Sequence, residues 1–117
     1  MKFSVTGAAT LIGVALMLGT QPASARPDES IRKGKALAVQ RCGACHATGK
    51  KDASPLHAAP PFRSLAYRYP VETLGEALAE GISVGHPDMP SEPWEPQDIK
   101  RFVAYLNSIG PKPANAR

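Results

Sequence analysis

Two cysteines and a histidine form the most chemically distinctive group in this sequence. Cys42 and Cys45 are separated by two small residues, and His46 follows directly. A C-x-x-C-H segment is typical of covalent haem attachment, in which each thiol forms a thioether with one vinyl group of the porphyrin. The neighbouring imidazole can then bind the iron from the same side. The segment therefore predicts one haem c held by Cys42 and Cys45, with His46 as an axial ligand.

Three other interpretations of the same residues stay open. A zinc site would need further ligands, which His57 and His86 could supply. A thioredoxin-like redox pair would need a βαβ context, and no segment has a convincing strand pattern. A disulfide between cysteines three positions apart would close a very small loop, stabilise little and leave His46 without a purpose. We favour haem over all three.

Two amphipathic segments, one at each end of the chain, are predicted to position this group. Small and apolar residues recur every three to four positions over a first helix from about Glu29 to Arg41, with Asp28 as its N-cap. A last helix is expected to start at Pro96, since helices accept proline in the first turn. It ends at Gly110, and its apolar face consists of Ile99, Phe102, Val103, Leu106 and Ile109.

The middle of the chain is expected to be mostly irregular. A short helix is predicted at 62–67 and a clearer one at 72–80, with Gly81 just past its end. Glycine and proline mark two long loops, 47–61 and 82–95. Loops of that length are unusual in so small a domain unless they wrap something. The prediction is an all-α fold built around a cofactor.

The pattern resembles the small class I (mitochondrial-type) c-type cytochromes of bacteria, from about Ile31 to Ile109. Gly34 stands eight residues before Cys42, like the glycine in the first helix of that family. The Val103-Ala104-Tyr105-Leu106 segment is similar to the A-Y-L motif of the family's last helix. The resemblance implies three to five short helices around one covalently bound haem, with the N- and C-terminal helices crossing where Gly34 meets Tyr105.

One position departs from the family pattern. An aromatic residue often follows the first-helix glycine by four positions, and here that residue is Ala38. Close packing requires the missing volume to come from elsewhere. We expect Phe102 to supply it from the last helix.

The resemblance also implies a second axial ligand. Met89 lies in the loop before the last helix, where the family places a Met-Pro pair. A thioether sulfur favours ferrous iron, so His/Met ligation raises the reduction potential. His86, in the same loop, is the main rival and would lower the potential. The expected metal ligands are therefore His46 and Met89.

Groups around the ligands are expected to orient them. The second ring nitrogen of His46 needs an acceptor, and the family uses a proline carbonyl after the first loop. Pro60 is our choice, with Pro61 second. The haem propionates need donors near a crevice of low dielectric. Trp94 is the best single candidate for that role, and the others are Arg63, Tyr67, Arg68 and Tyr69.

The first 25 residues have the pattern of a secretory signal. Lys2 gives a positive start, residues 8–18 are almost all apolar, and Ala23-Ser24-Ala25 fits a small-x-small cleavage site. We expect residues 1–25 to be cleaved, residues 26–111 to form the cytochrome domain and residues 112–117 to be a flexible tail. The expected location is the periplasm, without stable membrane insertion after cleavage. An uncleaved membrane anchor is the alternative.

Charge is distributed unevenly along the rest of the chain. From 26 to 68 there are nine Lys/Arg against three acidic residues, and from 69 to 117 there are four against seven. Such asymmetry can orient a small protein in the field of a charged partner, although an ordinary solvated surface explains it equally well. The basic residues are scattered and no recognition motif accompanies them, so nucleic acid is not an expected partner.

Filled axial positions would make the protein an electron carrier and not an enzyme, since no open site remains for oxygen or peroxide. Its expected partners are redox proteins such as a dehydrogenase, a cytochrome complex or a terminal oxidase or reductase, and we expect a monomer. Two alternatives stay open. The protein could be a dedicated subunit of one exported dehydrogenase, or a haem sensor or peroxidase-type enzyme in which Met89 leaves the iron.

Overall fold

The computed structural model describes residues 26–82, 88–89 and 91–112, and these residues form an all-α fold. The expected fold class is therefore confirmed. Three helices, α1 (Pro27–Cys42), α2 (Leu74–Glu80) and α3 (Pro96–Ile109), are joined by two short 3-10 helices, η1 (Phe62–Tyr67) and η2 (Val71–Thr73). The predicted signal segment 1–25, and the predicted tail apart from residue 112, lie outside the described residues.

Helix α1 begins at Pro27, two residues before the predicted start at Glu29. Arg26 occupies the N-cap position and Pro27 the first turn, while Asp28 lies inside the helix, so the prediction of Asp28 as N-cap was wrong. Proline is favoured there because its missing N–H would have no helical partner. Asp28 and Glu29 still stabilise the first turn, since carboxylates interact favourably with the positive end of the helix dipole.

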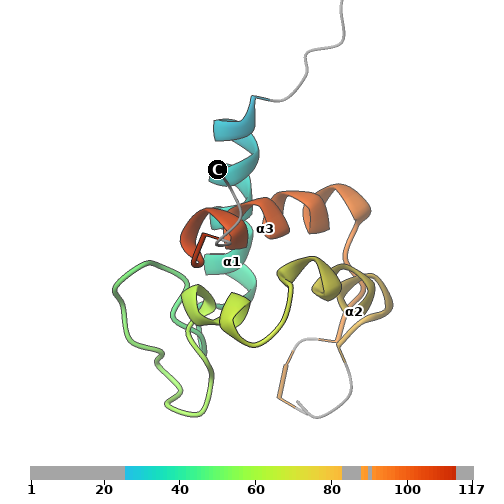
Figure 1. The fold of residues 1–117 in the computed structure, drawn as a ribbon. Coiled ribbons are helices and arrows are strands. Elements are labelled where there is room, and N and C mark those ends of the chain that lie inside the picture. The colour runs from blue at the N-terminus through green and yellow to red at the C-terminus, as the bar shows by residue number, and fades with distance from the viewer. Residues whose placement is uncertain (1–25, 83–87, 90, 113–117) are drawn as a thin grey trace, which may run out of the picture.

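Helices α1 and α3 cross in the middle of the molecule, as Figure 1 shows. At the crossing, a Cβ atom added to Gly34 would come within 2.8 Å of the Tyr105 Cβ and would overlap the Arg101 carbonyl. Only a residue without a side chain permits this approach. The predicted contact between Gly34 and Tyr105 is confirmed.

Aromatic side chains fill the core below the crossing. Ala38 is fully buried, and Phe102 belongs to the same core cluster. The Phe102 ring packs edge-on against Phe62, with ring centres 5.5 Å apart, and lies 5.1 Å from the ring of Trp94. This arrangement agrees with the expectation that Phe102 offsets the small Ala38.

The predicted helix at 72–80 has two parts. Its first turn is the tight η2, and only Leu74–Glu80 is α-helical. Gly81 follows with φ = 89°, a conformation that favours glycine, and thus ends the helix as expected. The chain returns past this point, because the Trp94 N–H donates to the Leu78 carbonyl at 2.9 Å. This hydrogen bond therefore holds together the two ends of the segment that carries Met89, and these ends form the base of that segment.

Candidate functional site

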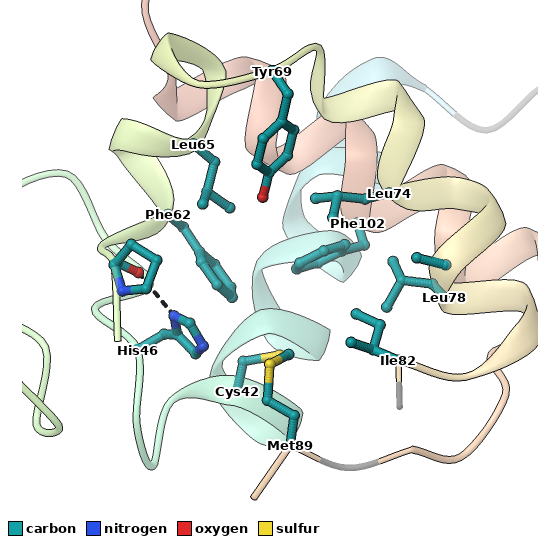
Figure 2. Close-up of a pocket in the computed structure, with 12 residues that line it drawn as sticks. Cys42, His46, Phe62, Leu65, Tyr69, Leu74, Leu78, Ile82, Met89 and Phe102 are labelled. Atoms are coloured by element: carbon teal, nitrogen blue, oxygen red, sulfur yellow. Dashed lines mark hydrogen bonds between the residues drawn. The ribbon is translucent and has the colours of Figure 1, made fainter. Parts of the chain in front are cut away.

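A cavity of about 180 Å³ lies between α1, η1, α2 and the segment that carries Met89. Its walls are almost entirely apolar, and Figure 2 shows them surrounding a common space. Three side chains bring donor atoms to it: a thiol from Cys42, an imidazole from His46 and a thioether from Met89. The apolar walls include Phe62, Leu65, Leu74, Leu78, Ile82 and Phe102.

The side chain of His46 is oriented by one hydrogen bond and by a contact with an aromatic ring. Its ring Nδ1–H donates to the Pro60 carbonyl at 2.8 Å, as the dashed line in Figure 2 marks. The predicted acceptor is thus the observed one. The ring centre lies 4.9 Å from that of Phe62, which packs against one side of the imidazole. With Nδ1 occupied as a donor, Nε2 is the nitrogen left to bind a metal.

A second, smaller hollow of about 140 Å³ adjoins the same donor residues. Cys42, His46 and Met89 line both hollows. The walls of the second hollow also include Arg41, Ala44, Cys45 and Asp88. Between them the two hollows are lined by both cysteines and by both predicted axial ligands, which are the side chains that a covalently bound haem needs. The residues present therefore fit a haem.

The structure does not favour the competing interpretations of the cysteines. Both thiols are free and half-buried. Burial raises the pKa of the Cys42 thiol to about 11, whereas reactive thiols of redox enzymes have lowered pKa values. No group of three His, Cys, Asp or Glu side chains that could hold a zinc ion occurs within 26–82, 88–89 and 91–112. His57 is exposed on the first loop, and His86 lies outside the described residues.

The other predicted site residues differ in whether they reach the cavity. Tyr69 is among the residues that line it. Trp94 is buried, packs against Phe102 and is not among the residues that line the cavity. Arg63 instead donates to the Asp52 carbonyl at 2.8 Å. Tyr67 and Arg68 lie beside the cavity, on an open groove next to η2. A role of Trp94 toward the propionates stays a prediction.

Several supporting contacts were missed in the sequence. The buried Tyr105 hydroxyl donates to the Thr48 carbonyl at 2.6 Å and thereby ties the first loop to α3. The Asp52 carboxylate accepts from the N–H groups of Thr48 and Gly49. Gly and Asp are both frequent in turns, which is the only sequence signal that pointed to this turn. Nothing in the sequence pointed to the partner of Tyr105.

Comparison with known proteins agrees with this geometry. A family model described as cytochrome c matches residues 31–110. The chain belongs to the cytochrome c family. Its cofactor is haem c, bound covalently through Cys42 and Cys45, and its general activity is electron transfer. Comparisons with curated proteins and with solved structures found no match.

Membership of the cytochrome c family also indicates what kind of partner the chain has. Redox proteins are the class of partner that the family implies. Among the residues that the structure describes, no helix has the length and apolar character needed to span a bilayer.

Proposed function

We propose that this cytochrome c is an exported one-electron carrier whose iron is bound by His46 and Met89. The observation that carries the proposal is the shared cavity, into which a thiol, an imidazole and a thioether project between apolar walls. The haem iron, when bound, takes up and releases one electron. Both axial positions would be filled by the protein, which leaves no site for oxygen or peroxide and favours transfer over catalysis.

Each group of site residues has a distinct part in this proposal. Cys42 and Cys45 would hold the porphyrin, and His46 would offer Nε2 to the iron while the Pro60 carbonyl fixes the orientation of the imidazole ring. Met89 would offer a soft sulfur, which stabilises ferrous iron and raises the reduction potential. The apolar walls exclude water and so tune the potential further.

Export to the periplasm is supported by the sequence before residue 26. A positive start, a short apolar run and an Ala-x-Ala site suit cleavage after Ala25. Covalent haem attachment in bacteria takes place after translocation, which is the location that the proposal requires. N-terminal sequencing of the purified protein tests this point, and a start at Arg26 is the expected result.

One observation favours the alternative of a dedicated dehydrogenase subunit. Tyr67 and Tyr69 stay exposed at a groove next to Pro70 and Pro111, although both side chains are large and aromatic. Exposed aromatic patches often mark protein contacts. Mild purification from the native host distinguishes the two cases, because a subunit would stay with its dehydrogenase and a free shuttle would not.

The decisive experiment is a visible spectrum of the purified ferric protein, because methionine bound to ferric haem iron gives a specific absorption band. Wild type is expected to show the band, and Met89→Ala to lose it, lower the reduction potential and bind carbon monoxide rapidly when reduced. His86→Ala is the matched control in the same loop and is expected to retain the band. Loss of the band in His86→Ala alone, or rapid carbon monoxide binding by wild type, would contradict the proposal.

A further inference from the structure

The end of α1 contacts the segment that leads into α3 through one stacked pair. The Arg41 guanidinium lies over the Trp94 ring, with its central carbon 4.6 Å from the ring centre. Arg41 is exposed, whereas the Trp94 side chain is only 8% exposed. The guanidinium therefore covers the outer face of a ring that is otherwise in the core. Arg41 directly precedes Cys42, so this contact joins the haem-attachment segment to the segment that leads into α3.

Trp94 is itself well placed to hold the Met89 segment. Its backbone N–H donates to the Leu78 carbonyl at 2.9 Å, and its ring packs against α3. Nearby, a Cβ atom on Gly81 would overlap the Ser91 carbonyl, which shows how closely the two ends of the segment approach each other. The base of this segment is thus bound to α2 and α3 through Trp94, and to α1 through the residue stacked on it.

Arg41 also reaches the site directly. Its side chain lines the smaller hollow together with Asp88 and Met89. We propose that Arg41 is a positioning residue, whose stacking on Trp94 keeps the Met89 segment against the haem-attachment helix and so keeps the thioether on the iron. This inference rests on the proposed ligation by His46 and Met89.

The expected effect is modest, because the Arg41 side of the pair is exposed to solvent. Stacking of a cation on an aromatic ring at an exposed site changes an equilibrium by about two- to fivefold. A lysine keeps the charge but lacks the planar guanidinium that covers the ring. Arg41→Gln should therefore raise the population with Met89 off the iron by about two- to fivefold, and Arg41→Lys by less.

Imidazole binding to the ferric protein measures that population, because imidazole occupies the iron only when Met89 has left it. Apparent imidazole affinity is to be compared among wild type, Arg41→Gln, Arg41→Lys and Lys35→Gln. Lys35 is exposed on the same helix, so its variant is the charge-matched control. A double-mutant cycle of Arg41→Gln with Trp94→Phe, followed by imidazole binding and by chemical unfolding, separates the pair from a general loss of stability.

The proposal expects tighter imidazole binding in Arg41→Gln, no change in Lys35→Gln, and a smaller effect of Arg41→Gln once Trp94 is Phe. Equal affinities in Arg41→Gln and Lys35→Gln would overturn it. Additive effects in the cycle would also overturn it, since they would assign the change to charge or stability and not to the stacked pair. A wild-type spectrum without the methionine band would instead refute the ligation on which the inference rests.

Discussion

The Tyr105 hydroxyl makes one of the longest-range contacts in the protein, to the carbonyl of Thr48 at 2.6 Å. Both residues are buried, so Tyr105→Phe leaves a carbonyl without its partner. We expect a loss of about 1–2 kcal/mol in the free energy of unfolding. Chemical denaturation of the haem-containing protein measures it. Tyr67→Phe is the control, because Tyr67 is 78% exposed; equal losses in both variants would show that the buried bond contributes nothing.

Asp52 gives the first loop a dependence on pH. Hydrogen bonds from the backbone N–H groups of Gly49 and Thr48, together with the charge of Arg63, hold the pKa of this carboxyl below its usual 3.8. A lowered pKa in the folded state means stability that is present above pH 4 and lost as the pH falls through the folded-state pKa. Asp52→Asn should therefore be less stable than wild type at pH 7, with the difference shrinking below pH 4. Denaturation at several pH values tests this, and a difference independent of pH would count against it.

Among the elements, the crossing of α1 and α3 has the least tolerance for added volume. Gly34→Ala would place a methyl group against the Arg101 carbonyl and the Tyr105 Cβ, in a contact formed mainly by backbone. We expect a loss of about 1–3 kcal/mol, as for other overpacked contacts. Thermal unfolding of the haem-containing protein measures the change.

Gly75→Ala in α2 is the matched control for that substitution. A Cβ atom there would lie 3.6 Å from the Ile99 Cγ2, an ordinary contact. Alanine also favours the helix over glycine, so Gly75→Ala should be neutral or stabilising. Equal stability of Gly34→Ala and wild type would show that the two helices can separate without cost.

The elements were largely predictable from sequence because they follow local rules. Periodic apolar residues located α1 and α3, and Gly81 and Gly110 marked helix ends. Asp28 was misplaced as N-cap because two signals, a capping side chain and a proline, competed within two residues. The positions of Trp94 and Arg63 could not be foreseen, since each depends on partners from distant segments.

The site was predictable to the extent that its chemistry is local. The cysteines and His46 form one short motif, and the bond to Pro60 followed from the resemblance to the family. The cavity walls are different, because Leu65, Leu78 and Phe102 come together only through tertiary packing. Ordinary apolar residues of that kind have no signature in the sequence.

On the scale of the whole molecule, the basic half of the chain supplies exposed charge near the haem-attachment segment. Arg41, Lys50 and Lys51 are all exposed. Lys50→Glu plus Lys51→Glu is expected to slow electron delivery to or from an acidic partner and to weaken the dependence of the rate on salt. Stopped-flow kinetics at low and moderate ionic strength measure both effects.

A control for charge alone uses the opposite end of α1. Arg26→Glu plus Arg32→Glu makes the same change in net charge far along the helix from Cys42, at two exposed residues. It should affect the rate less than the Lys50 and Lys51 pair. Unchanged rates at low salt in the Lys50 and Lys51 variant would remove the steering hypothesis.

Until a porphyrin is attached, the apolar walls of the cavity beside His46 have no solid partner to pack against. A small domain with such a hollow at its centre has little burial to offset its conformational entropy. We therefore expect maturation to be ordered: the new polypeptide stays loose and open to the attachment enzymes, and it becomes compact and resistant to proteases only afterwards. Polypeptide that does not receive haem would then remain sensitive to proteases, and the cell would degrade it without needing a dedicated sensor.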